Sequence, residues 1–175
     1  YKAKNSFCYN DEESNCTKYG RLYRWSAAMD SAGTYWPTHS LNGCGYNKTC
    51  SVTLPVEGAC PHGWHLPIVE EFETLAATVG DVKKLRSATG WSGSGANGTD
   101  DYAFSALPAG YLDSYSDEDG YGLYYGEGTA AGFLTANEKD KYNAQHLELE
   151  SSYGSATFYI GSKNKGYSIR CIKDN

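Results

Sequence analysis

The sequence predicts a single α+β domain over residues 1–175, with two helices followed by a loop-rich, twisted antiparallel sheet. Two helical patterns occur, one after Pro67 and a shorter one over residues 81–88. From residue 102 onward only short runs typical of strands occur. Twenty Gly and sixteen Tyr also favour short strands and irregular segments over a helical bundle. A chain of 175 residues is long enough to bury one core.

The segment 60–79 is the best-defined element. Pro61, Gly63 and Pro67 set the path of the chain into a helix, and proline suits the first helical turn because no intrahelical N–H is needed there. Apolar residues then recur at three- and four-residue spacing, which predicts one buried face: Ile68 or Val69, Phe72, Leu75, Ala76 and Val79. Glutamates in the opening turns suit the positive end of the helix dipole.

Six cysteines predict disulfides and an oxidising compartment. Six cysteines can pair in fifteen ways, so spacing alone does not fix the connectivity. Two pairs would each bracket a short polar loop, and the remaining two cysteines would then close a long one. The expected pairs are Cys8–Cys16, Cys44–Cys50 and Cys60–Cys171. A zinc site would need paired Cys-x-x-Cys or His-x-x-x-His spacings, which the chain lacks. The protein is therefore expected in the periplasm, at the cell surface or in the medium.

The other segments are placed by composition and alternation. Residues 1–20 are expected to be a peripheral N-terminal segment, 21–32 a strand-to-helix transition, and 33–59 an insertion loop. Strands are expected at 102–107, 121–125, 129–135, 144–149, 155–160 and 166–172. In the fifth of these, Ala156, Phe158 and Ile160 should share one face. The last strand carries Cys171, which would tie the sheet to the main helix.

Four blocks together resemble the Fibrobacter succinogenes major paralogous domain family. They are CPHGWHLP at 60–67, GW at 90–91, FSALPAG at 104–110 and GYSIRC at 166–171, and the similarity extends over residues 20–173. The 63–75 block is also similar to a helix of formylglycine-generating enzymes, a superfamily with a C-type-lectin-like fold. The resemblance implies that fold and the Cys60–Cys171 disulfide. Phe72 departs from the pattern, because the family usually has Trp there, and Ile68 replaces a polar capping residue.

The residues favour a protein without metal or catalytic groups. His62 and His65 lack a third ligand at a suitable spacing. The acidic run before Gly120 fails the EF-hand pattern because Tyr115 and Gly126 occupy ligand positions, so structural calcium stays a minor alternative to a solvated loop. No nucleophile–base pair and no late cysteine pair is recognised, although a glycosidase carboxylate pair is a spatial feature that sequence does not reveal. No cofactor is expected.

Charge and hydropathy limit the partners. The formal charge of −6 argues against nucleic acid, because binding phosphates needs a basic surface. No apolar stretch is long enough to span a membrane, so no membrane insertion by this segment is expected.

Residues 111–167 are dense in Tyr, Asn, Ser and Gly, the mixture that antibody paratopes use. Tyrosines in a sheet poor in aliphatic residues also build the core, so we expect alternate positions to divide between core and surface. The candidate ligand-binding residues are Tyr115, Tyr121, Tyr142, Asn143, Tyr153 and Asn164. The sequence thus indicates a secreted or cell-surface, non-catalytic binding or adhesion module for a glycan or protein ligand. The alternatives are a self-assembling subunit of a surface layer or fibre, and an enzyme of the formylglycine-generating superfamily.

Overall fold

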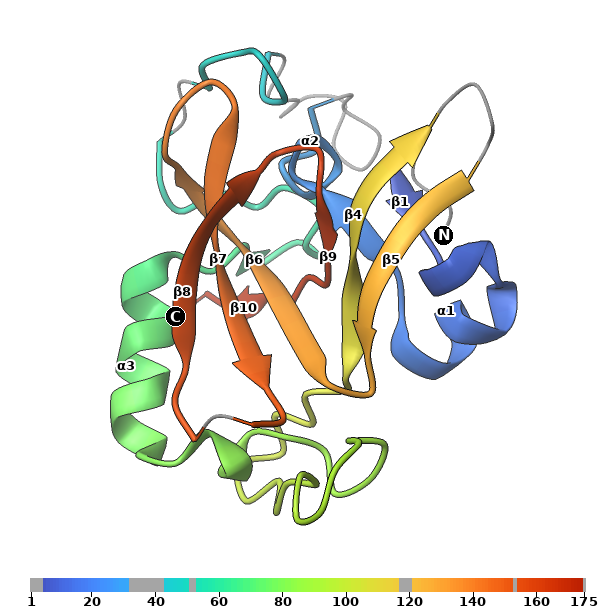
Figure 1. The fold of residues 1–175 in the computed structure, drawn as a ribbon. Helices are drawn as coiled ribbons and strands as arrows, with labels where there is room; N and C mark the ends of the chain where they lie inside the picture. Colours follow the sequence, from blue (N-terminus) through green and yellow to red (C-terminus); the bar gives the residue numbers. More distant parts are fainter. Residues whose placement is uncertain (1–4, 32–42, 51–52, 117–120, 153, 175) are drawn as a thin grey trace.

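The computed structural model describes residues 5–31, 43–50, 53–116, 121–152 and 154–174, and shows an α+β fold (Figure 1). The α-helices are α1 (Glu13–Tyr19), α2 (Trp25–Ala28) and α3 (Val69–Val79), and the 3₁₀ helices are η1 (Tyr9–Asp11) and η2 (Val82–Lys84). The strands are β1 (Ser6–Phe7), β2 (Leu22–Arg24), β3 (Trp64–His65), β4 (Ala109–Ser116), β5 (Tyr121–Glu127), β6 (Ala130–Glu138), β7 (Asn143–Glu150), β8 (Thr157–Ser162), β9 (Gly166–Tyr167) and β10 (Ile172–Lys173).

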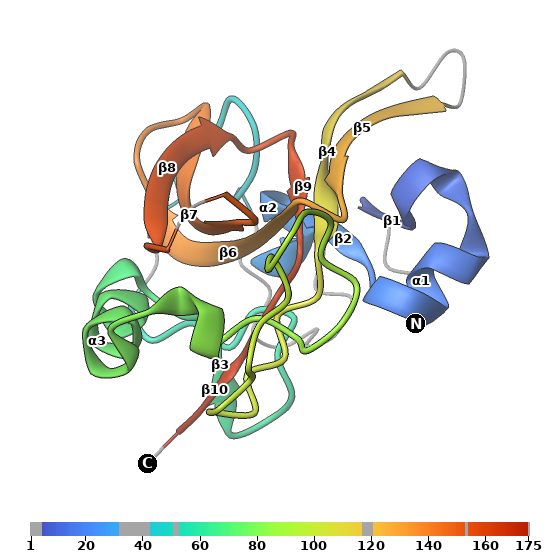
Figure 2. The ribbon, with the colours of Figure 1, turned by 60° about the horizontal axis from the view of Figure 1, so that its bottom comes forward.

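The main sheet has eight strands in the order β1-β2-β9-β4-β6-β7-β8, with β5 paired to β4, and Figure 2 shows its strong curl. The expectation of a purely antiparallel sheet is wrong, because β4 and β6 pair in parallel at Gly110 and Ala131. The reason is topological. The chain reverses between β4 and β5 and again between β5 and β6, so β6 runs in the direction of β4 and can only pair with it in parallel. β3 and β10 form a separate antiparallel pair.

Helix α3 covers one face of the β6–β7 region. Val69, Phe72 and Val79 are buried, and Leu75 is partly buried against the same core, as the apolar spacing predicts. The rings of Phe72 and Phe133 lie with centroids 6.4 Å apart, which joins the helix to β6. The Ile68 N–H donates to the Glu71 carboxylate at 2.9 Å, and this bond satisfies one N–H at the helix start although position 68 lacks a polar side chain.

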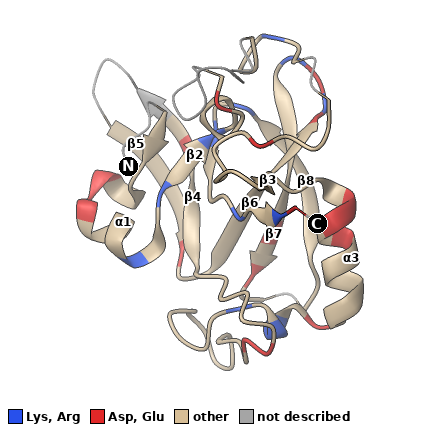
Figure 3. Ribbon diagram, turned by 180° about the vertical axis from the view of Figure 1, so that it is seen from behind, with Lys and Arg blue, Asp and Glu red and all other residues tan. Residues whose placement is uncertain are grey.

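The C-terminal residues are fastened to the start of α3. Cys60 and Cys171 form a disulfide with Cα atoms 5.8 Å apart, and β10 pairs with β3 beside it. His65 lies between two carboxylates, with its Nδ1 atom 2.6 Å from Asp174 and its Nε2 atom 2.9 Å from Glu71. Figure 3 shows the C-terminus next to the acidic beginning of α3. A covalent bond, a strand pair and ion pairs therefore act at one place.

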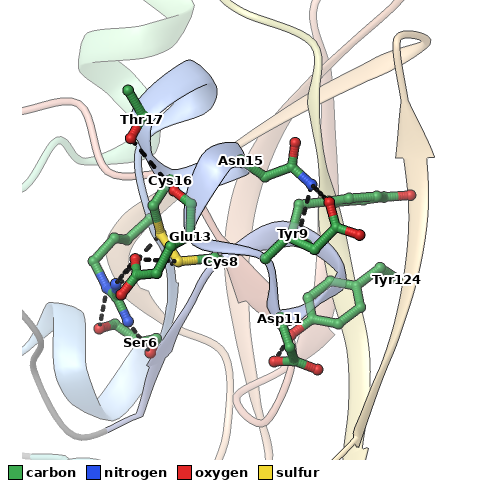
Figure 4. The surroundings of a disulfide bond; sticks show 11 residues. Ser6, Cys8, Tyr9, Asp11, Glu13, Asn15, Cys16, Thr17 and Tyr124 are labelled. Atoms are coloured by element: carbon green, nitrogen blue, oxygen red, sulfur yellow. Dashed lines mark hydrogen bonds and ion pairs between the residues drawn. A yellow bond between two sulfur atoms is a disulfide. The ribbon is translucent and has the colours of Figure 1, made fainter.

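The N-terminal segment is a disulfide-closed unit docked on the β4–β5 hairpin (Figure 4). Cys8 and Cys16 are bonded with Cα atoms 4.8 Å apart, and the unit contains η1 and α1. Its contacts to the hairpin come from Tyr9, whose ring centroid lies 5.2 Å from that of Tyr124, and from Asp11, which accepts a hydrogen bond from the Tyr124 hydroxyl at 2.6 Å. Helix α1 has no buried residue, but its Tyr19 hydroxyl donates to Glu127 of β5 at 2.9 Å and its Lys18 ammonium lies 3.6 Å from the same carboxylate. Contacts from both η1 and α1 therefore hold the unit in place.

The loop closed by Cys44 and Cys50, whose Cα atoms are 4.6 Å apart, is held by a buried ion pair. The Lys163 side chain is fully buried; its ammonium pairs with Glu138 and donates to the Lys48 carbonyl at 3.0 Å. The Cys50 N–H in turn donates to both Glu138 oxygens, at 2.9 and 3.0 Å. These bonds fix the described part of the expected 33–59 insertion to the end of β6.

The structure corrects three expectations about elements. Residues 102–107 form no strand, and the strand of this region is β4, seven residues later at its start. The helix expected at 81–88 is only the three-residue η2. The run expected at 166–172 is divided into β9 and β10, which lie in different sheets. Phe158 and Ile160 occupy alternate positions of β8, as expected for one face, although Ile160 is 55% exposed.

All three expected disulfides are confirmed, and none of the six cysteines is free. Three disulfides indicate a protein of an oxidising compartment. Within the described ranges, no helix is both long and apolar enough to cross a membrane.

Candidate binding groove on the sheet

A groove of about 220 Å³ opens on the face of β7 that points away from α3. Successive side chains of a strand point to opposite faces, so Leu147 and Leu149 join the core under α3 while His146, Glu148 and Glu150 line the groove. Segments from β4, β8 and β9 complete the walls (Figure 1). The three successive strands β7, β8 and β9 and the more distant β4 thus contribute to one concave site.

The base of the groove is aromatic. Tyr167 is only 4% exposed, its ring stacks on His146 at a centroid distance of 4.1 Å, and the Tyr111 ring lies 5.7 Å from it. Tyr159 stands at the rim, 41% exposed, with its ring 6.0 Å from His146. Gly161 keeps this space open, since a Cβ atom there would lie 3.0 Å from the His146 ring. The groove therefore offers ring faces at its floor and at its edge.

The polar groups of the groove are mainly acidic. Glu148 lies 3.6 Å from the His146 Nε2 atom, and the Glu150 carboxylate has no partner among the residues that the structure describes. Lys165 also lines the groove, but Asp113 neutralises it at 2.6 Å and its ammonium lies 5.5 Å from the centre of the Tyr111 ring. The carboxylates are therefore the main hydrogen-bond acceptors open to a ligand.

Two tyrosine hydroxyls also face this space without a partner. Across the described part of the chain, neither Tyr111 nor Tyr167 forms a hydrogen bond through its hydroxyl. Burial raises the pKa of Tyr167 strongly, and the nearby Glu148 carboxylate adds to the effect. Burial likewise raises the pKa of Tyr111. Both hydroxyls therefore stay protonated at neutral pH and can donate to a ligand.

Four of the six residues expected to bind ligand are described by the structure, and these four lie elsewhere. The turns that carry Tyr142, Asn143 and Asn164, and the start of β5 with Tyr121, lie at the end of the sheet away from the β7–β8 turn (Figure 1). None of these four lines the groove. The Tyr115 side chain and Tyr153 fall outside what the structure describes.

Each of these four residues has a distinct setting. Tyr121 is 74% exposed. Tyr142 packs on Tyr46 with ring centroids 5.3 Å apart. Asn143 donates to both oxygens of Asp140 at 3.1 Å and so supports the β6–β7 turn, while the Asn164 carbonyl accepts a hydrogen bond from Arg24 at 3.2 Å. The Asn143 side chain thus has a local role without a ligand, whereas the bond at Asn164 involves only its backbone.

The alternation of side chains along a strand could have identified some of the groove residues from the sequence. His146, Glu148 and Glu150 occupy alternate positions of an expected strand, and Tyr111, Tyr159 and Tyr167 belong to the Tyr-rich segment 111–167. Sequence spacing does not show that these strands converge, because the approach of Tyr167 on β9 to His146 on β7 is a tertiary feature.

Within the described ranges, His62 and His65 belong to no cluster of three or more metal-ligating side chains. Both ring nitrogens of His65 are engaged by carboxylates, and the His62 Nδ1 atom pairs with Glu57 at 3.1 Å. Burial disfavours the charged form of His65, but Asp174 and Glu71 outweigh it and raise its pKa. Cys8, Glu13 and Cys16 also lie close together, yet both sulfurs belong to a disulfide and are not available as thiolates.

Fold and site together define a disulfide-linked α+β domain with an aromatic, acidic groove on its sheet. The chain belongs to the Fibrobacter succinogenes major domain family, which matches residues 1–173. Searches of curated proteins and of solved structures gave no significant match.

Proposed function

We propose that the protein is a secreted or surface-displayed binding module that holds a carbohydrate in the groove of Tyr111, Tyr159 and Tyr167. The observation that carries the proposal is the combination of ring faces with two carboxylates, Glu148 and Glu150, in one concave site. The apolar face of a sugar ring can stack on tyrosine, and its hydroxyls can donate to carboxylates. The volume of about 220 Å³ lies below the usual range for drug-sized ligands, which favours a single ring or the end of a glycan chain.

Three features support a role in binding rather than catalysis. All six cysteines are paired, so no thiol remains for the cysteine oxidation of formylglycine-generating enzymes. Glu148 and Glu150 project from one face of one strand, whereas glycosidases place their two carboxylates on either side of the scissile bond. The disulfides support export from the cytoplasm, and the 63–75 block supports kinship with C-type-lectin-like domains.

The test is a glycan array followed by titration calorimetry with the best ligand. Tyr159→Ala should weaken binding about tenfold, equivalent to about 1.4 kcal/mol, because an exposed stacking surface is lost. Glu150→Gln should weaken binding without unfolding the protein, since that carboxylate has no partner among the described residues.

Tyr121→Ala is the matched control, because it removes a more exposed tyrosine outside the groove. If Tyr121→Ala lost binding while Tyr159→Ala bound fully, the ligand site would be assigned to the end of the sheet that carries Tyr121 and not to the groove. Release of new reducing ends from the bound glycan would instead assign a glycosidase.

A second candidate function is self-assembly through β5. Tyr121, Leu123 and Tyr125 alternate along this strand and are 74%, 58% and 51% exposed, which forms an apolar stripe. A second copy of the chain would cover it in a layer or fibre. Sedimentation at increasing concentration should then show association that Leu123→Glu abolishes, and a monomer at all concentrations would refute this candidate.

A further inference from the structure

A second pocket, of about 300 Å³, lies between the first half of α3, the loop at 102–104 and the C-terminal segment 170–172. Its walls are largely apolar and come from Phe72, Leu75, Tyr102, Phe104 and Ile172. It shares no lining residue with the groove on β7. Its volume falls at the lower end of the usual range for small-molecule sites.

The one cationic group in this lining is Arg170. Its guanidinium stacks over Phe104, 4.8 Å from the ring centre, and forms no hydrogen bond or ion pair with any residue that the structure describes. Burial lowers its pKa and Asp100 opposes the shift, but an arginine pKa starts so high that the group stays charged at neutral pH. A guanidinium offers five N–H donors, and here they face an apolar pocket.

Neither nearby carboxylate, Glu71 or Asp100, forms an ion pair with Arg170, and the oxygens of Asp100 accept hydrogen bonds from Ser105. Glu71 is the acidic residue of the lining, and its two oxygens bond to His65 and to the Ile68 N–H, each at 2.9 Å. The cationic charge of Arg170 is therefore available to an anion from outside.

The loop that forms one wall is held in an unfavourable backbone conformation. Asp100, Ala103 and Ser105 have positive φ angles of 53°, 52° and 50°. Such a conformation is unfavourable for a non-glycine residue, because it brings the Cβ atom too close to the following carbonyl oxygen. The Asp100 carboxylate fixes the loop by accepting hydrogen bonds from the Ser105 N–H, at 2.7 Å, and from the Ser105 hydroxyl. Backbone strain of this kind concentrates at ligand sites.

We propose that this pocket binds a small aromatic carboxylic acid. The carboxylate would take a bidentate contact from Arg170, the geometry that a guanidinium matches best. The ring would lie against Phe104, Tyr102 and Leu75. The guanidinium of Arg170 selects the acid over its neutral or basic relatives.

Phenylacetate and phenylacetamide test the proposal, because they share their shape and differ in charge. Amide resonances of the ¹⁵N-labelled protein are followed during titration with each compound. Phenylacetate should shift the resonances of residues 71–75, 102–104 and 170–172 and bind at least tenfold more tightly than phenylacetamide. Equal affinities, or shifts that map elsewhere, would overturn the proposal without any variant being needed.

Arg170→Gln should reduce phenylacetate binding at least tenfold and leave phenylacetamide binding unchanged, and Arg170→Lys should recover only part of the loss. Arg24→Gln, which removes an arginine outside the pocket, is the control and should bind as the native protein does. Thermal denaturation of each variant checks folding. A peptide ending in phenylalanine that binds more tightly than phenylacetate would contradict a small acid as the occupant. Glycan binding should be unaffected by Arg170→Gln, so this proposal and the carbohydrate groove can fail separately.

Discussion

His65 joins three parts of the chain through one imidazole ring. Glu71 lies in the first turn of α3, and Asp174 directly follows β10. Both carboxylates accept hydrogen bonds from the protonated imidazole ring. Because the folded protein raises the pKa of His65, it binds a proton more tightly than the unfolded chain does. Stability gained in this way is present below the unfolded pKa, about 6.5, and is lost as the pH rises through the folded pKa.

We therefore expect His65→Gln to lower the free energy of unfolding by about 1–2 kcal/mol near pH 5.5. This loss lies at the low end of what a hydrogen bond to a charged group contributes, because the Asp174 side chain is 48% exposed and water weakens its interaction with the ring. The difference from the native protein should shrink at higher pH. Urea denaturation at several pH values measures it, with His62→Gln as the control because that side chain is 83% exposed. A difference that grows with pH would contradict the assignment of His65 as a protonated bridge.

At the scale of elements, β4 depends on one glycine. Gly110 has a φ angle of +64°, and a Cβ atom there would lie 2.2 Å from the Tyr125 carbonyl oxygen and 2.8 Å from the Tyr9 ring. Gly95 has a similar φ angle of +66°, with nothing within 4 Å of its Cβ position. Both positions therefore require a left-handed backbone conformation, but only Gly110 has other atoms close to where a side chain would lie.

Gly95→Ala should cost about 1 kcal/mol, from the left-handed backbone alone. Gly110→Ala should cost about 2–5 kcal/mol, because the crowding of the β4–β5 pair adds to the strain, or should prevent folding. Chemical denaturation of both variants gives the comparison. Similar losses would show that the backbone conformation alone decides at both positions.

The elements that sequence predicts well are those whose signals are local. Helix α3 has an apolar spacing that continues for three turns, and β5, β6, β7 and β8 have alternating or apolar runs. Helix α1 buries no side chain and so has no apolar spacing to reveal it. The apolar run at 102–107 predicts a strand, but this segment forms a loop in which Asp100 accepts a hydrogen bond from the Ser105 N–H, and β4 begins only at Ala109. The parallel contact of β4 with β6 depends on the path of the whole sheet.

The groove and the second pocket likewise depend on contacts that local sequence patterns do not reveal. Sequence composition directs attention to residues 111–167, but it favours exposed tyrosines such as Tyr121 over the partly buried ring of Tyr111. The groove needs the face of β7 to meet β9, and the second pocket needs Arg170 to lie beside Phe104. Both conditions join residues distant in the sequence, so no spacing rule shows them.

At the scale of the molecule, the Cys60–Cys171 disulfide spans 111 residues and Cys44–Cys50 spans 6. In the chain-entropy model, a disulfide stabilises the folded protein by restricting the unfolded chain, and a longer closed loop gives a larger effect. The stabilisation is about 4–5 kcal/mol for a loop of roughly a hundred residues and about 2–2.5 kcal/mol for the short loop. Replacing Cys60 and Cys171 with Ser should therefore destabilise the protein about twice as much as replacing Cys44 and Cys50. Denaturation without reductant tests this order, and equal losses would contradict it.

The disulfide between the start of α3 and the last strand also determines how the domain would respond to mechanical force. A pull on both ends would pass through the Cys60–Cys171 bond, so the segment that holds α3, the β4–β8 strands and the groove would carry no tension and could not be stretched. Extension would be limited to the residues outside that covalent loop until the bond was reduced. A module anchored in a moving or sheared environment would in this way keep its groove intact under load.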